Sequence, residues 1–150
     1  MTEPGENRMK KAGGIFLIAM LFFLMAACAG DPGGNRPVSP LPGNLIMLDA
    51  GEWPENEYTA DMPHPESGTV ERGWIDPEKK YCCIEFSDMT QSKSEQYVEA
   101  LKKAGFREAD KVSEEIGSSS LSVGILLTRE DTGVSLSYLN DLCAMYIKKK

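Results

Sequence analysis

An unbroken apolar run from Ile15 to Ala27 limits which part of this 150-residue chain can form a folded domain. The run follows the basic residues Arg8, Lys10 and Lys11, and such an arrangement is typical of a secretory signal peptide. As a helix, its 13 residues would span about 20 Å, less than the roughly 30 Å hydrocarbon core of a bilayer. We therefore predict that residues 1–27 are a cleaved signal peptide, with an uncleaved N-terminal anchor as the alternative.

The end of this run, Leu24-Met25-Ala26-Ala27-Cys28, resembles the lipobox of bacterial lipoproteins. In that family diacylglycerol is attached to the cysteine thiol, and cleavage then makes the cysteine the first residue. Met25 departs from the usual Leu, Val or Ile, although it is also apolar. The resemblance implies that Cys28 is lipidated and that the chain is held on the extracytoplasmic face of the cell membrane, because two acyl chains anchor a protein stably. An ordinary signal peptide, cleaved after an Ala-x-Ala-like site, is the alternative.

A second candidate start lies inside the leader. The segment Thr2–Arg8 is acidic and unlike the beginning of a signal peptide, whereas Met9-Lys10-Lys11 is a common beginning. We hypothesise that translation starts at Met9. The intact mass of an unprocessed Cys28→Ser precursor distinguishes the two starts.

Glycine and proline dominate the segment from Ala29 to Asn44. Such a composition cannot form a packed core, and prolines cannot donate the hydrogen bonds of a sheet. We assign residues 28–50 to the lipidated cysteine and a tether, whose 16 Gly- and Pro-rich residues reach at most about 50 Å. Leu45–Leu48 is the first apolar stretch after them and is predicted to dock on the domain formed by residues 51–150.

Residues 51–150 contain one helix pattern among several strand patterns. The predicted fold class is α+β, an antiparallel sheet of about five strands with one helix packed on one face, in the order strand-strand-helix-strand-strand-strand. Residues 111–120 are predicted as a loop or a weak edge strand. A proline-containing strap over residues 53–65, with Trp53, Tyr58 and Met62 as anchors, precedes strands at 69–75, 80–87, 121–129, 134–138 and 143–147.

The helix is predicted to run from Ser92 to Ala104. Ser92 and Glu95 have the spacing of a capping box, and Gly105 is the expected left-handed terminator. The apolar stripe of this helix consists of Tyr97, Val98, Leu101 and Ala104. The core face of the sheet is predicted from the alternation of Cys82, Ile84 and Phe86, continued by Leu121, Val123, Ile125, Leu127, Val134, Leu136, Tyr138, Cys143, Met145 and Ile147.

Charge excludes one class of partner. The leader holds three of the 16 Lys and Arg residues and two of the 23 Asp and Glu residues, so the remaining chain has a net charge of −8. A surface of this sign repels nucleic acid and anionic lipid headgroups. We therefore expect no nucleic-acid partner.

The cysteines of the domain suggest one candidate cross-link. Cys82 and Cys143 fall on the same predicted face, so a disulfide bond can form if their strands are neighbours with Cα atoms within about 7 Å. The alternative is that both are buried free thiols that pack as small apolar groups. Cys83 points to the other face and would be unpaired, and the spacing of the cysteines matches no zinc site.

No catalytic, cofactor-binding or metal-ligating residue is predicted. The single histidine, His64, lies between two prolines, with no partner that would make it a general base. The sequence contains no Gly-x-Ser-x-Gly elbow, no phosphate-binding glycine loop before a helix and no EF-hand loop. We interpret the acidic residues Glu52, Glu55, Glu57 and Asp61 as a solvated part of the strap.

Several short patterns resemble a group of bacterial lipoprotein domains from Gram-positive gut anaerobes. They are Trp53-Pro54-x-Asn56 with Thr59, Pro63-x-Pro65, and a Tyr97–Leu101 helix ending in Ala104-Gly105-Phe106. The resemblance covers roughly residues 53–147. It implies a lipoprotein location and supplies no activity or catalytic residues.

Together these patterns predict a membrane-anchored, non-enzymatic accessory lipoprotein that binds a small ligand or an envelope protein. One alternative is an envelope enzyme with a dispersed site, and another is a sensor or inhibitor domain with an uncleaved anchor. The sensor or inhibitor would bind protein through the outer sheet face, where we place Tyr81, Leu126 and Leu139. A deep pocket with convergent polar groups would favour a ligand or an enzyme, and a flat apolar sheet face would favour a protein partner.

Overall fold

The structure is a computed structural model that describes residues 44–150. The predicted signal peptide, Cys28 and most of the tether therefore lie outside the described residues. The elements are β1 (Ile46–Leu48), β2 (Thr69–Asp76), β3 (Tyr81–Ser87), α2 (Gln91–Lys103), β4 (Arg107–Ile116), β5 (Ser120–Arg129), β6 (Thr132–Leu139) and β7 (Leu142–Lys149).

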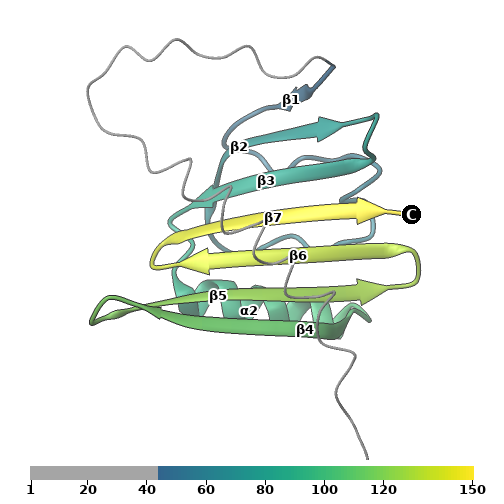
Figure 1. The fold of residues 1–150 in the computed structure, drawn as a ribbon. Coiled ribbons are helices and arrows are strands. Elements are labelled where there is room, and N and C mark those ends of the chain that lie inside the picture. Colours follow the sequence, from purple (N-terminus) through teal and green to yellow (C-terminus); the bar gives the residue numbers. More distant parts are fainter. Residues whose placement is uncertain (1–43) are drawn as a thin grey trace, which may run out of the picture.

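The strands form one antiparallel sheet in the order β1-β2-β3-β7-β6-β5-β4 (Figure 1). An antiparallel sheet with a single helix in the described chain confirms the α+β prediction. The sheet has seven strands, however, instead of about five. The two additional strands, β1 and β4, form its two edges.

Strand β4 covers most of the segment predicted as a loop or weak edge strand. Its sequence, READKVSEEI, is mostly exposed and strongly charged, so burial imposes no alternation on it. An edge strand needs only one partner, and exposed charges protect its free edge from pairing with another chain. Strand β5 supplies that partner, with Val112 opposite Gly124. At the other edge, β1 pairs with β2 within the range assigned to the tether.

The helix and the strap lie on the same side of the sheet, which we call the inner face (Figure 1). On β3 the predicted core residues Cys82, Ile84 and Phe86 are at most 2% exposed. The strap adds two buried anchors, Tyr58 and Met62, and Trp53 packs partly buried against the core. From the neighbouring strands the inner face also buries Val123, Ile125, Leu127, Val134, Leu136, Tyr138, Cys143, Met145 and Ile147, as predicted.

Helix α2 begins one residue earlier than predicted because Thr90, not Ser92, is the N-cap. The Thr90 hydroxyl accepts from the backbone N–H of Lys93, which satisfies one of the free donors of the first turn. At the other end Gly105 has φ of +96°, and the N–H of Phe106 donates to the Leu101 carbonyl at 3.1 Å. This is the glycine-terminated ending that the sequence predicted.

The Trp-Pro-x-Asn pattern builds the turn of the strap. The Asn56 side-chain oxygen accepts from the backbone N–H of Tyr58 at 2.9 Å, as in an Asx turn. The Thr59 hydroxyl donates to the Pro54 carbonyl and accepts from the N–H of Asn56. These bonds close the turn locally, so Tyr58 is held against the inner face of the sheet.

Candidate functional site

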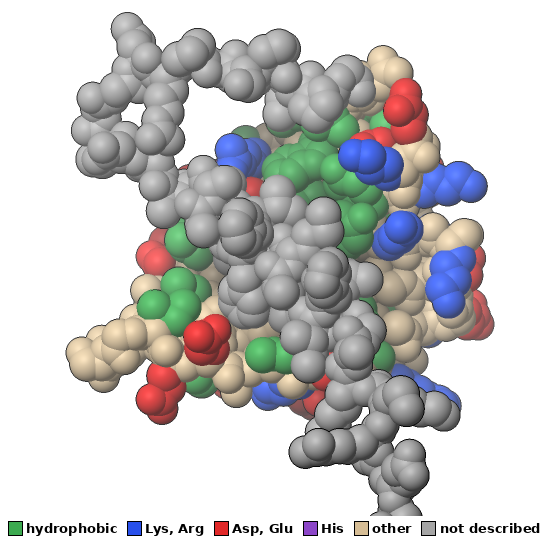
Figure 2. All heavy atoms as spheres, in the orientation of Figure 1, with side chains coloured by type: hydrophobic (Ala, Val, Ile, Leu, Met, Phe, Trp, Pro, Cys, Tyr) green, Lys and Arg blue, Asp and Glu red, His purple; other side chains and the backbone are tan. Residues whose placement is uncertain are grey.

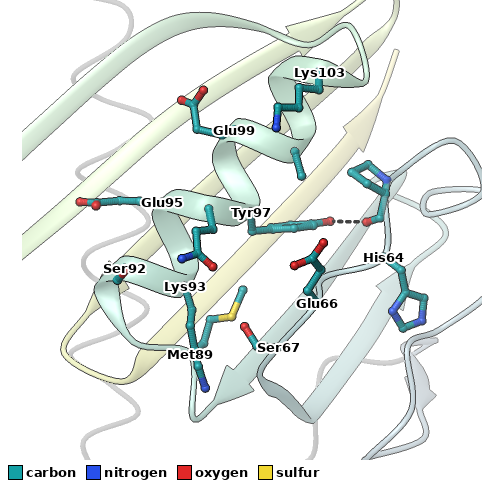
Figure 3. A pocket seen from close by; sticks show the side chains of 13 residues that line it. His64, Glu66, Ser67, Met89, Ser92, Lys93, Glu95, Tyr97, Glu99 and Lys103 are labelled. Carbon is teal, nitrogen blue, oxygen red and sulfur yellow. Dashed lines mark hydrogen bonds between the residues drawn. The ribbon is translucent and has the colours of Figure 1, made fainter.

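A groove of about 520 Å³ lies between α2 and the end of the strap (Figure 3). Its size falls within the range of small-molecule sites, about 300–1,000 Å³. It is an open groove and not a deep enclosed cavity. Its lining comes from two segments that the sequence analysis did not connect. One is the end of the strap with the residues that follow it, and we extend the name strap to residue 67: Pro63, His64, Glu66 and Ser67. The other is α2 with the residue Met89 just before it: Met89, Ser92, Lys93, Glu95, Gln96, Tyr97, Glu99, Ala100 and Lys103.

Tyr97 joins the two walls of the groove. Its hydroxyl donates to the Pro63 carbonyl at 3.0 Å, so it fastens the strap to α2. The side chain is 3% exposed, and burial raises the pKa of Tyr97 well above its ordinary value, which keeps the hydroxyl a neutral donor. Figure 3 shows the Glu66 carboxylate directed toward the Tyr97 ring, whereas His64 points away from the groove.

Both signs of charge line the groove. Lys103 lies at one end and Lys93 at the other, with Glu66 between them (Figure 3). Glu95 and Glu99 add carboxylates from α2. The groove therefore offers groups that can pair with an ammonium and with a carboxylate, and Lys93 Nζ also donates to the Asp88 carbonyl at 3.0 Å.

His64 makes contacts that do not belong to a proton-transfer site. Its ring lies 5.2 Å from that of Trp53, and its Nδ1 is 3.4 Å from the Pro65 carbonyl oxygen. A general base needs hydrogen-bond contact with the group whose proton it takes. Within residues 44–150, no group of three or more His, Cys, Asp or Glu residues could hold a metal ion.

Cys82 and Cys143 are buried free thiols in the structure. Their strands β3 and β7 are neighbours, but Cys82 lies opposite Ile147 and Cys143 lies opposite Phe86. Four positions along a strand correspond to about 13 Å, whereas a disulfide bond needs Cα atoms within about 7 Å. The candidate Cys82–Cys143 disulfide bond is therefore wrong for this register. Burial raises the pKa of each thiol to about 12, so both are protonated and unreactive at neutral pH.

A second candidate surface lies on the opposite, outer face of the sheet. One cross-strand row there contains Met47, Trp74, Cys83 and Tyr146 on β1, β2, β3 and β7. Tyr81 packs on Tyr146 with ring centroids 4.7 Å apart. Met47, Trp74, Tyr81, Cys83 and Tyr146 form what we call the aromatic patch.

The outer-face prediction was correct for part of this surface. The register places Tyr81 on that face, and Leu126 continues the row beyond Ser135. Trp74 and Tyr146 were missed as members of the surface, because a single strand does not reveal which residues will be its cross-strand neighbours. Their alternation with inner-face residues was the available signal.

Comparison of the chain with known protein families, curated proteins and solved structures gives no match. In the part of the chain that the structure describes, the helix is too short and polar to cross a membrane. Function therefore has to be inferred from the residues of this chain.

Proposed function

We propose that this protein is a membrane-anchored extracytoplasmic lipoprotein whose domain acts by non-covalent binding. Lipidated Cys28 would hold the chain on the membrane, and residues 28–50 would space the domain from it. The observation that carries the anchor is the lipobox-like Leu24–Cys28 segment at the end of an apolar run. The resemblance to bacterial lipoprotein domains supports the same location.

We further propose that the groove between α2 and the strap binds a small molecule that carries both an ammonium and a carboxylate. Glu66 would pair with the ammonium, and Lys93 or Lys103 with the carboxylate. Free amino acids and short peptides have this chemistry. The groove's mixed charge supports binding, and the contacts of His64 with Trp53 and the Pro65 carbonyl favour binding over an enzymatic role.

Metabolic labelling with a palmitate analogue tests the anchor. Wild-type chain should be labelled and found in the membrane fraction, whereas Cys28→Ser should be unlabelled. Cys83→Ser is the matched control and should be labelled as wild type. Equal labelling of Cys28→Ser and wild type would show that the anchor assignment is wrong.

Thermal-shift measurements with amino acids and dipeptides test the groove. A ligand should raise the melting temperature of the wild-type chain by mass action. Glu66→Gln should weaken its binding by about tenfold or more, because a charged hydrogen bond contributes about 1.5–3 kcal/mol. The matched control Glu114→Gln lies on β4 and should leave binding unchanged. No stabilisation by any such compound, or equal loss in both variants, would contradict the assignment.

A further inference from the structure

The aromatic patch lies on the face of the sheet away from α2 and the strap. Figure 2 shows the hydrophobic side chains gathered on this face with Lys and Arg around them. Met47 is 52% exposed, and Trp74, Tyr81 and Tyr146 are half-buried. Scattered exposed apolar residues are normal, but an apolar row that crosses four adjacent strands is a continuous surface.

The composition of the patch matches the headgroup region of a bilayer. Trp and Tyr each combine an apolar ring with a polar group, an indole N–H or a phenol hydroxyl. Such side chains concentrate where an apolar phase meets water, because the ring enters the acyl region and the polar group stays among the headgroups.

Basic side chains border the patch. The Arg72 guanidinium lies 6.0 Å from the ring centroid of Trp74, and Lys148 lies directly opposite Tyr81. Lys80 comes just before Tyr81 and is exposed. Lys80 and Lys148 stand next to the aromatic rings, where they can reach the phosphates of lipids into which the rings insert, whereas Arg72 is paired with Glu85.

Two carboxylates close to the patch are compensated. Glu85 forms an ion pair with Arg72. Asp76 accepts the backbone N–H groups of Glu78 and Lys79 at 3.1 and 2.9 Å. Four other acidic side chains lie away from the patch, on β4 at the opposite edge of the sheet from β1. Part of the repulsion expected from net charge therefore acts at a distance from this surface.

The chain outside the described residues ends beside the patch. It joins the domain at Asn44, three positions before Met47, which belongs to the patch. If Cys28 carries the lipid, the tether reaches the domain at β1, the sheet edge that borders the patch. The domain could then lie with the outer face on the bilayer and the groove directed away from it.

We propose that the aromatic patch docks reversibly on the surface of a bilayer that contains anionic phospholipid. The docking proposal depends on the proposed lipid anchor only because that anchor keeps the domain close to the membrane. The patch adds a fixed orientation of the domain that a flexible tether alone cannot give. The groove between α2 and the strap would then face away from the membrane.

Tryptophan fluorescence of the unlipidated chain tests this directly. The chain from residue 28 onward, without the apolar leader and with Cys28→Ser and Trp53→Phe, has Trp74 as its single tryptophan. Vesicles of phosphatidylglycerol and phosphatidylcholine should shift Trp74 emission to the blue, and brominated lipids should quench it. Raised salt should weaken the binding, because the basic residues act through screened charges. The labelling of Cys28 is measured separately, so failure of the anchor and failure of the patch are distinguishable.

Two variants assign the binding to the patch. Lys148→Gln should weaken vesicle binding about fivefold, as expected for one basic residue near an anionic surface. Lys111→Gln, on β4 at the far edge of the sheet, is the matched control and should bind as the parent does. Both are surface changes that should leave the fold intact, which near-ultraviolet circular dichroism checks.

Three results would overturn the proposal. They are an unchanged Trp74 emission with anionic vesicles at low salt, equal binding to pure phosphatidylcholine, and equal loss in the Lys148 and Lys111 variants. A photo-crosslinker placed at position 74 should react with lipid in intact cells. Its capture of an envelope protein instead would identify the patch as a protein-docking surface, which also overturns the proposal.

Discussion

The thiols of Cys82 and Cys143 couple the stability of the domain to pH. Burial raises the pKa of each from an ordinary value of 9.0 to about 12. Above pH 9 the unfolded chain releases these protons while the folded chain keeps them, so the folded state binds more protons. Its free energy of unfolding therefore falls as pH rises from about 9 toward 12, and this contribution is fully present below pH 9.

We predict that each buried thiol steepens this fall by up to about 1.4 kcal/mol per pH unit. Urea unfolding at a series of pH values measures the slope, and between pH 9 and 10 the thiols act before most tyrosines ionise. The Cys82→Ala, Cys143→Ala double variant should show a shallower slope, whereas Ser113→Ala, an exposed change that removes no thiol, should retain the wild-type slope. Identical slopes in the double variant and the wild type would contradict the assignment.

Among the elements, the end of α2 gives a test of backbone conformation. Gly105 has φ of +96°, which side-chain-bearing residues rarely adopt, and a Cβ there would meet only Arg129 at an ordinary 3.5 Å. Gly105→Ala should therefore lower the free energy of unfolding by about 1 kcal/mol through backbone strain alone.

Gly133 on β6 is the matched control for that substitution. Its φ is not in the left-handed range, and a Cβ would meet nothing within 4 Å. Gly133→Ala should change stability by no more than about 0.5 kcal/mol. If urea unfolding shows that both variants lose the same free energy of unfolding, the positive φ of Gly105 is not the cause of its loss.

The elements that could be predicted from the sequence are those in which burial repeats with a regular period. The inner face of β3 and three of the four residues of the predicted apolar stripe, Tyr97, Val98 and Leu101, were predicted correctly, because each element buries one side against the core, whereas Ala104 follows α2 and is partly buried. Strand β4 has no side that is buried along its length, and its pairing with β5 depends on tertiary contact. The short β1 likewise forms a strand through its pairing with β2, which is a tertiary contact.

The candidate surfaces could be predicted less well, because both combine distant segments. The groove joins Glu66 on the strap to Lys93 and Lys103 on α2, and no motif in either segment anticipates the other. The aromatic patch depends on the register of β2, β3 and β7, which fixes Trp74, Cys83 and Tyr146 in one row. The same register separates Cys82 from Cys143, which shared a face in the sequence pattern.

Over the whole molecule, the sheet consists of two sequence-local halves joined at one seam. Strands β1 to β3 form one half, β4 to β7 form the other, and only the β3–β7 pairing connects them within the sheet. The seam pairs Tyr81–Phe86 with Cys143–Lys148, residues far apart along the chain. Each half alone would leave the hydrogen bonds of the seam unmade and its share of the common core uncovered, so neither half is expected to be stable alone.

Because the seam joins the two halves, we predict that a substitution that destabilises one half also destabilises the other. Met145 on β7 is fully buried and lies opposite Ile84 on β3, so Met145→Ala should cost about 2–5 kcal/mol. Trp53 and Trp74 report on the first half, and far-ultraviolet circular dichroism reports on the whole sheet. Both urea midpoints should fall together in the variant, and the exposed Ser113→Ala on β4 should leave both unchanged. If the tryptophan midpoint stayed at its wild-type value while the dichroism midpoint fell, the halves would be independent units and the seam would not make the domain cooperative.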